Sequence, residues 1–352
     1  MPLLTSSQFR RYKDIAALLF KHGGRELVER IGFGDAIEDD WADAAQQAQA
    51  EELADDLEAL GPTFVKLGQV LASRADLLPL PYLKALSRLQ DEVEPFAYGE
   101  VERIVAEALG ASPHELFATF DVEPMAAASL GQAHRATLPD GRRVVVKVQR
   151  PGVREQVETD LAALHQIARW IDGHSEFGQR YQFLQTIRQF RRSLMHELDY
   201  TREADNLRTL RRNLADFNAI VVPEPIDNLT TPSVLTMQYV DGVRITDVSS
   251  AQRRQIDGLK LVDTLFHAYL KQVLQDGFFH ADPHPGNVLL TRRGQVGILD
   301  LGMIGQVDED LQENLLNLLL AVSEGRGDDA ADLAVRVGDR SAVFDPQAFR
   351  AG

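Results

Sequence analysis

The chain has 352 residues, of which 44% are hydrophobic and 26% are charged. These proportions are ordinary for a folded globular protein, and they exclude collagen-like, fibrous and disordered classes. The sequence has no cysteine, which excludes a disulfide framework, a thiolate nucleophile and a cysteine-based zinc site. The net charge of −16 argues against general nucleic-acid binding, which needs a basic face to replace phosphate counterions.

The first hundred residues predict mainly helices. Residues 8–30 predict an amphipathic helix with a basic side, which either packs on the domain or lies on an anionic membrane surface. Residues 35–58 contain ten acids and no Lys or Arg, and we interpret this block as a solvated helix face or a connector. Gly61-Pro62 predicts the start of another helix, because proline suits the first helical turn.

Strands enter the pattern from about Phe120. Residues 129–149 predict a β-hairpin around Asp140-Gly141, and residues 288–299 predict a second hairpin. A single helix is expected over 180–214. The other expected elements are helices over 153–172 and 251–276, strands over 221–222 and 233–240, and helices after Asp308. Strands with long helices, followed by a mostly helical part, predict an α+β fold with two lobes.

The clearest chemical motif is the segment 280–287, His-Ala-Asp-Pro-His-Pro-Gly-Asn, which Asp300-Leu-Gly follows at the end of an apolar strand. Phosphoryl transfer needs an acid that orients the acceptor hydroxyl, and oxygen ligands for Mg²⁺. Asp282 and Asn287 have the H-x-D-x-x-x-x-N spacing of a kinase catalytic loop, and Asp300 has the place of the D-F-G aspartate. We predict that Asp282 orients the acceptor and that Asn287 and Asp300 hold metal, while His280 supports the loop.

Lys147 lies in an apolar strand, where an ammonium group is costly unless it meets an anion. A kinase-type lysine meets the α- and β-phosphates and a carboxylate of the following helix. We predict Glu203 as that carboxylate, because Asp199 and Glu203 share a face of the expected helix and Glu197 points away from Asp199. The alternatives are a strand lysine that reaches solvent and an ordinary charged helix.

Ahead of Lys147, on the first hairpin, lies the loop that would cover the phosphates. It carries alanines where a protein kinase has glycines, so positive φ angles are restricted and the backbone stays further from the phosphates. A later strand, over 233–240, would contact the adenine, with Met237 behind the ring. The nucleotide contacts expected from these two segments are Ala126, Ala127, Ala128, Ser129, Met237 and the backbone of Gln238, Tyr239 and Val240.

These motifs together resemble the UbiB (ADCK) family of atypical protein-kinase-like proteins over roughly residues 60–322. A further mark is K-x-G-Q, formed by Lys66 to Gln69; Lys66, Gln69 and Ser73 recur on one helix face. The resemblance implies that this helix lies across the active site, with Lys66 and Gln69 reaching it and Lys66 near Glu197 or Asp199. It also implies ATP or ADP with Mg²⁺ as cofactors, and a role in isoprenoid quinone or related lipid biosynthesis near a membrane.

We therefore expect a bilobal protein-kinase-like α+β fold with an N-terminal helical extension packed over the active site. The expected parts are N-terminal helices with the acidic segment over 1–60, the K-x-G-Q extension over 61–119, an N-lobe over 120–240 and a C-lobe over 241–352. Residues 301–322 contain no Ser, Thr or Tyr, and no A-P-E follows Asp300. The usual phosphorylation switch and peptide platform are therefore expected to be missing.

The expected activity is a Mg²⁺-dependent ATPase or phosphotransferase. The expected partners are nucleotide, a lipid or quinone-precursor ligand and a membrane surface, in a cytoplasmic protein that associates with the inner face of a membrane. One alternative is a nucleotide-gated scaffold with no phosphoacceptor. Another is a small-molecule kinase of the aminoglycoside or choline type, against which the K-x-G-Q motif and the alanines count.

Overall fold

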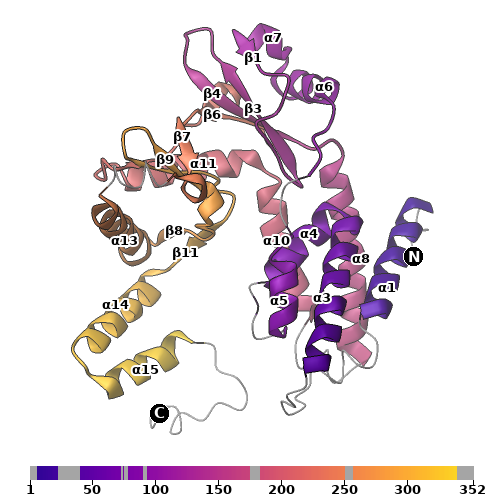
Figure 1. The fold of residues 1–352 in the computed structure, drawn as a ribbon, viewed down its shortest axis with the longest axis vertical. Helices are drawn as coiled ribbons and strands as arrows, with labels where there is room; N and C mark the ends of the chain where they lie inside the picture. Colours follow the sequence, from indigo (N-terminus) through magenta and orange to yellow (C-terminus); the bar gives the residue numbers. More distant parts are fainter. Residues whose placement is uncertain are drawn as a thin grey trace. The chain divides into compact units, whose positions relative to one another are not determined.

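The computed structural model describes residues 6–22, 40–72, 74, 78–89, 93–174, 183–249 and 257–338. The chain divides into two compact units (Figure 1). The first unit is formed from residues 1–201 and 227–236, and the second from residues 202–226 and 237–352. The four-part division expected from the sequence stays a prediction.

The sheet of the first unit has the strand order β1-β3-β4-β6, and β2 pairs with β3. The predicted hairpin around Asp140-Gly141 is confirmed, with Thr137 opposite Arg143 in an antiparallel pair. The valines of its second strand are buried, which explains why this segment extends as a strand. The strands are β1 (Thr119–Phe120), β2 (Ala126–Ala127), β3 (Gly131–Thr137), β4 (Arg143–Gln149) and β6 (Val234–Gln238), whose first three residues belong to this unit.

Helices make up the rest of the first unit. They are α1 (Ser6–His22), α3 (Asp40–Leu60), α4 (Pro62–Ala72), α5 (Leu80–Leu86), α6 (Tyr98–Leu109), α7 (Pro113–Leu116), α8 (Val153–His174) and α10 (Phe183–Glu197). The helix predicted to open at Gly61-Pro62 is confirmed. Of the helix predicted over 8–30, residues 23–30 lie outside the described ranges. Apolar residues of α1, α3, α4, α5 and α8 share one core, with Ile15, Phe64 and Leu86 among its fully buried members.

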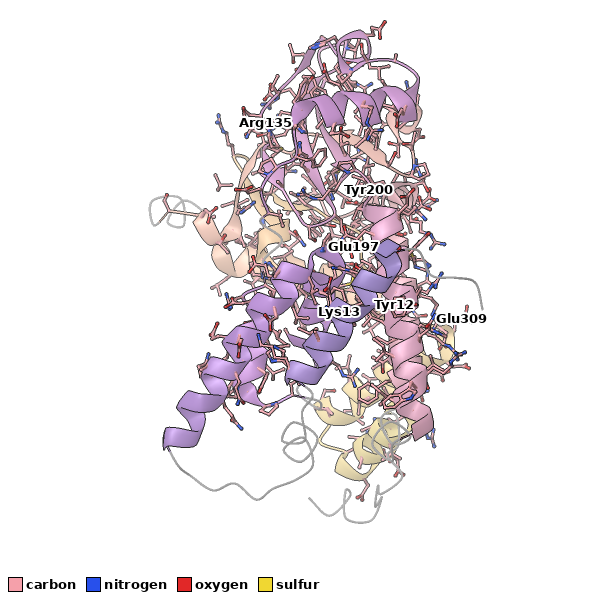
Figure 2. All side chains as sticks on the ribbon, turned by 90° about the vertical axis from the view of Figure 1, so that its right-hand side faces the viewer. Tyr12, Lys13, Arg135, Glu197, Tyr200 and Glu309 are labelled. Carbon is pink, nitrogen blue, oxygen red and sulfur yellow. The ribbon has the colours of Figure 1, made fainter. Side chains whose placement is uncertain are left out.

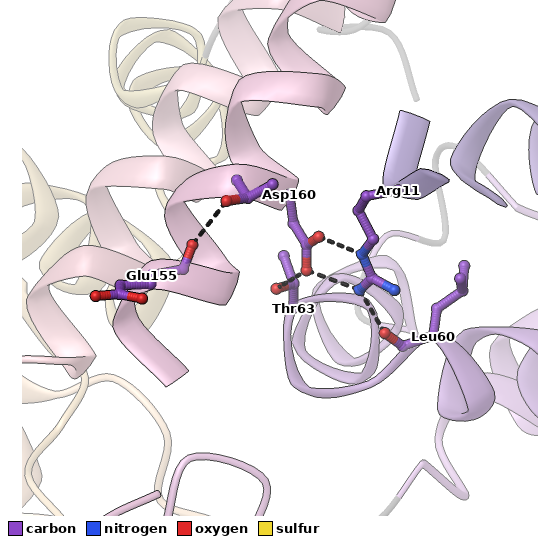
Figure 3. A network of polar contacts seen from close by, with 6 residues as sticks. Arg11, Leu60, Thr63, Glu155 and Asp160 are labelled. Carbon is purple, nitrogen blue, oxygen red and sulfur yellow. Dashed lines mark hydrogen bonds and ion pairs between the residues drawn. The ribbon is translucent and has the colours of Figure 1, made fainter. Parts of the chain in front are cut away.

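A buried carboxylate joins three of these helices (Figure 3). Asp160 of α8 is 0% exposed and accepts hydrogen bonds from Arg11 Nε, from Arg11 Nη2 at 2.8 Å and from Thr63 Oγ1 at 2.6 Å. Arg11 Nη2 also donates to the carbonyl of Leu60, at the end of α3. Arg11, from the basic side of α1, thus packs in the domain, as the first of the two alternatives expects, while Lys13 is exposed and the membrane alternative stays a prediction.

The helix predicted over 180–214 is two helices, so that prediction was wrong. Helix α10 ends at Glu197 and α11 (Tyr200–Asn213) begins three residues later, and Figure 2 labels the two residues on either side of the break; residues 180–182 lie outside the described ranges. Asp199 Oδ1 accepts from the backbone N–H of Thr201 at 3.1 Å and from its hydroxyl at 2.6 Å. Aspartate favours such a cap over a helix interior, so Asp199 and Glu203 are not an i, i+4 pair of one helix.

The second unit contains two sheets and four described α-helices. The predicted second hairpin is confirmed, with Val296 opposite Leu290. One sheet has the order β5-β10-β9-β7, and the other pairs β11 with β8. The elements are β5 (Ile220–Val221), β7 (Gly242–Arg244), β8 (Phe278–His280), β9 (Val288–Thr291), β10 (Val296–Ile298), β11 (Ile304–Gln306), α11, α13 (Gly258–Leu274), α14 (Glu309–Ser323) and α15 (Gly327–Val337). Within the described ranges no helix has both the length and the apolar composition needed to cross a bilayer.

Candidate functional site

The segment 280–287 leaves strand β8 and is supported by His280. The imidazole is 3% exposed, and its Nδ1 accepts from the backbone N–H of Asp282 at 3.2 Å. Burial lowers the pKa of His280, which keeps the ring neutral and Nδ1 able to accept. Asp282 itself is exposed. These contacts agree with the supporting role predicted for His280.

Two residues of α13 hold the same segment, and the sequence analysis missed both. Gln272 is 2% exposed, and its Oε1 accepts from the backbone N–H of His280 at 3.1 Å. Tyr269 Oη donates to the carbonyl of His280 at 3.2 Å. A glutamine on the apolar side of an amphipathic helix was the available sign, because a buried amide needs hydrogen-bond partners.

Asp300 follows strand β10 with a φ of +54°, and it is the only described non-glycine residue with a positive φ. Such a conformation costs about 1–3 kcal/mol and persists where the surroundings impose it, often at functional sites. The carboxylate accepts from the backbone N–H of Gly302 at 3.3 Å. The carbonyl of Asn287 accepts from the N–H of Leu299 at 2.8 Å. A backbone hydrogen bond therefore joins the segment that carries Asn287 to the segment that carries Asp300.

The Asn287 and Asp300 side chains fit a magnesium ion better than a metal that protein side chains alone would coordinate. In the described part of the chain no three His, Asp or Glu side chains form a group that could hold a metal. Mg²⁺ usually keeps several waters and takes one or two protein oxygens together with substrate phosphates. The Asn287 amide and the Asp300 carboxylate would supply such oxygens.

The end of β6 carries the residues predicted to contact adenine. Met237 is 4% exposed, as expected for a side chain behind a ring. The backbone N–H of Gln238 donates to the carbonyl of Glu224 at 2.8 Å. The predicted backbone contact of Gln238 with an adenine edge is therefore limited to the Gln238 carbonyl.

In the first unit, strand register lines up the alanine segment with the lysine. Ala126 pairs with Ala133, and Ala133 pairs with Lys147. Directly opposed residues project to the same face of a sheet. Ala126 and Lys147 therefore lie on one face, two strand spacings apart, or about 10 Å.

The alanine segment ends in a tight turn that needs a glycine. The N–H of Ala128 donates to the carbonyl of Gly131 at 2.7 Å. A Cβ at Gly131 would lie 2.5 Å from the carbonyl oxygen of Val148 and 2.7 Å from Tyr200 Oη. Ser129 is 2% exposed, so its side chain is buried within the turn. The turn is thus fixed against β4 by close backbone packing.

Behind the turn lies a buried chain of hydrogen bonds. The N–H of Phe96 donates to Gln132 Oε1 at 2.9 Å, and Gln132 Nε2 lies 2.9 Å from His134 Nε2. His134 Nδ1 lies 2.8 Å from the carbonyl of Asp121. A neutral His134 that donates from Nδ1 and accepts at Nε2 satisfies every member. Burial lowers the pKa of His134, in agreement with that state.

The His134 environment predicts an acid-sensitive first unit. Because the pKa of His134 is lower in the folded protein, its contribution to stability is present above the unfolded pKa and is lost as the pH falls through the folded pKa. Below about pH 6.5 the unfolded state binds one more proton, so stability should fall by up to about 1.4 kcal/mol per pH unit. Urea unfolding between pH 7.5 and 5 should show this slope, and His134→Gln should reduce it. An equal slope in both proteins would contradict the assignment.

Helix α4 carries the K-x-G-Q residues. Lys66 Nζ lies 2.7 Å from Glu197 Oε1, at the end of α10, so the structure pairs Lys66 with one of the two acids that the resemblance implied. Gln69 Nε2 instead donates to the carbonyl of Leu89 at 3.0 Å, which ties α4 to the segment after α5. Ser73 lies outside the described residues. Asp199 is the cap of α11 described above.

Glu203, in the first turn of α11, is 5% exposed. It belongs to the second unit and Lys147 to the first. Their pairing stays a prediction, as do the catalytic, nucleotide-binding and metal-binding roles of the residues above.

Comparisons with known proteins agree with this arrangement. The model of the ABC1 atypical kinase-like domain matches residues 88–333. A solved structure of Rv3197 with erythromycin from Mycobacterium tuberculosis aligns with a TM-score of 0.58 and 26% identity, over 86% of this chain and 76% of that one. The architecture is thus an α+β, bilobal kinase-like fold. The chain belongs to the ABC1 atypical kinase-like family, and the predicted resemblance to UbiB proteins is confirmed.

Several of the curated relatives carry kinase names. A "Probable protein kinase UbiB" of Cellvibrio japonicus is 38% identical over 83% of this chain and 53% of its own length. "Protein ACTIVITY OF BC1 COMPLEX KINASE 8, chloroplastic" of Arabidopsis thaliana is 39% identical over 82% of this chain and 38% of its own length. The chain spans about half the length of the first curated relatives it matches.

Proposed function

We propose that the chain binds ATP or ADP with Mg²⁺ and hydrolyses or transfers the γ-phosphate slowly. One observation carries the proposal: Asp300, two residues after the end of β10, keeps a costly positive φ, and β9 of the same hairpin begins directly after Asn287. A strained acid beside a second oxygen donor is what a metal–nucleotide site requires. Family membership supports the same reading.

Each residue has a distinct task in this proposal. Asp282 orients the acceptor hydroxyl or water, and the neutral His280 ring fixes the backbone of Asp282. Lys147 neutralises the α- and β-phosphates, and Glu203 orients Lys147. Asn287 and Asp300 would hold Mg²⁺, which when bound neutralises charge that develops on the phosphates. The backbone of Gln238, Tyr239 and Val240 and the side chain of Met237 receive the adenine.

We further propose a role in isoprenoid quinone or related lipid biosynthesis, with a lipid or quinone precursor as ligand and peripheral attachment to the inner face of a membrane. The support is the similarity to proteins named UbiB. The test is ADP release by purified protein with and without phenolic quinone precursors or anionic vesicles. Asp282→Asn serves as the inactive control, because it keeps the shape of the side chain and removes the base. If Asp282→Asn releases ADP as fast as wild type, the proposal of an enzymatic activity at this site is rejected.

A nucleotide-gated scaffold is the second candidate. It is favoured by the Lys66–Glu197 ion pair and by the turn at Ala128–Gly131, which is held tightly against β4. Both features would limit the movement of the proposed nucleotide site more than catalytic turnover requires. Nucleotide binding without ADP release under every condition tested would favour the scaffold.

The alanines are expected to set how the phosphates are held. Ala127→Gly and Ala128→Gly should change the ratio of ATP to ADP affinity, because glycine lets the backbone amides approach the γ-phosphate. Calorimetric titration with both nucleotides measures the ratio. Ala118→Gly, outside the turn on the same unit, is the matched control. If both variants have the same ratio of ATP to ADP affinity as wild type, the alanine loop does not affect how the phosphates are held.

Lys66→Ala is expected to raise basal ADP release and to lower the free energy of unfolding by about 1–2 kcal/mol. This loss is smaller than for a fully buried ion pair, because the Lys66 and Glu197 side chains are 17% and 24% exposed. Glu197→Gln should do the same, and the double variant should cost less than the sum. Additive effects with unchanged ADP release would show that the ion pair has no functional role.

A further inference from the structure

One side chain of α11 reaches the backbone beside Asp300. Asn206 Nδ2 donates to the carbonyl of Leu301 at 2.8 Å. Asn206 lies three residues after Glu203, so both residues lie on neighbouring positions of one helix face. The roles given to Asp300, Asn287 and Glu203 do not use this contact.

The segment around Asp300 needs such an anchor. The positive φ of Asp300 is costly, and a strained backbone relaxes unless its neighbours hold it. Leu301 is 0% exposed, which fixes its side chain, and Gly302 N–H is bonded to the Asp300 carboxylate at 3.3 Å. Beyond these contacts, the carbonyl of Met303 accepts from the N–H of Ala281 at 3.1 Å. Between Asp300 and that contact, the carbonyl of Leu301 is held by the Asn206 amide.

We infer that Asn206 is a positioning residue for the metal-holding carboxylate of Asp300. It acts through the Leu301 carbonyl and keeps the backbone of Asp300 in its left-handed conformation. The carboxylate is thereby presented in one orientation before any ligand arrives. Because Asn206 and Glu203 share α11, a shift of this helix moves the anchor of Asp300 together with the predicted partner of Lys147. The inference rests on the proposed nucleotide function and assigns a residue that the motifs do not contain.

The test compares wild type, Asn206→Ala and Asn206→Gln in the whole 352-residue chain. Thermal unfolding with saturating ADP is followed over a series of Mg²⁺ concentrations. Loss of one hydrogen bond to a buried segment should raise the Mg²⁺ concentration for half-maximal stabilisation about tenfold in Asn206→Ala. Asn206→Gln keeps the amide one methylene further out, so it should fall between the two. Asn213→Ala, at the end of the same helix, controls for general effects on α11.

A second readout needs neither nucleotide nor metal. Hydrogen exchange of the peptide that contains Leu301 to Met303 should be faster in Asn206→Ala than in wild type and in Asn213→Ala. Equal exchange together with an equal Mg²⁺ requirement would overturn the inference. So would a lower unfolding temperature without any change in the Mg²⁺ requirement, because that pattern describes a structural residue only. A wild type that nucleotide and Mg²⁺ do not stabilise at all would instead reject the proposed function, and the exchange measurement would still decide the role of Asn206.

Discussion

Replacement of Asp160 by alanine is expected to lower the free energy of unfolding of the first unit by about 3–5 kcal/mol. The carboxylate is fully buried and satisfies two nitrogens of Arg11 and the hydroxyl of Thr63. Without the carboxylate, the Arg11 guanidinium, which is 19% exposed, loses its counter-charge. The buried hydroxyl of Thr63 loses its hydrogen-bond acceptor. Urea unfolding followed by circular dichroism at pH 7 measures the loss.

The control removes both charges. Arg11→Met combined with Asp160→Leu should recover most of the lost stability, because apolar replacement of a whole buried pair is often neutral. Asp55→Ala, an exposed position on α3, should change stability little, since exposed ion pairs contribute at most about 1 kcal/mol. A loss below about 1 kcal/mol in Asp160→Ala would mean that the network does not hold the helices together.

Asp300→Asn is expected to abolish the Mg²⁺-dependent part of nucleotide stabilisation. Asparagine tolerates a positive φ, so the backbone is kept while the charge is removed. At a ligand concentration one hundred times the Kd, wild type should gain about 2.7 kcal/mol, and the variant should lose that gain. Thermal unfolding with ATP, in Mg²⁺ or in EDTA, separates the metal-dependent part.

The matched control for charge is Asp310→Asn, in the exposed first turn of α14. It should keep the full Mg²⁺ response. If Asp300→Asn also keeps that response, Asp300 does not hold the metal, and Asn287 with Asp282 would be tested next as the ligand pair.

Local chemistry predicted much of the fold. The Asp140-Gly141 turn, the proline that opens α4 and the hairpin over 288–299 were all readable, because turn and cap residues act within a few positions of the chain. The spacing of Asp282, Asn287 and Asp300 was readable for the same reason. Even the break before α11 had a local sign, since Asp199 precedes Tyr-Thr-Arg-Glu as an N-cap would.

Contacts between distant residues were not readable. Nothing near Asp160 indicates that its partners are Arg11 and Thr63, and nothing near Asn206 indicates the Leu301 carbonyl. Gln132 and His134 lie in a strand, where alternation predicts burial but not which polar group each will meet. Such pairings depend on how whole elements pack, which the pattern of one segment does not contain.

The Arg11–Asp160 contact also has a consequence for the order of folding during synthesis. Its two residues are 149 positions apart, so α1 leaves the ribosome long before the helix that receives it. At about 5–20 residues per second, α1 waits roughly 7–30 s for its partner. Until then the apolar side of α1, with Ile15, has no α8 to cover it. We therefore expect α1 to dock late, and the nascent chain to depend most on chaperones before α8 has emerged.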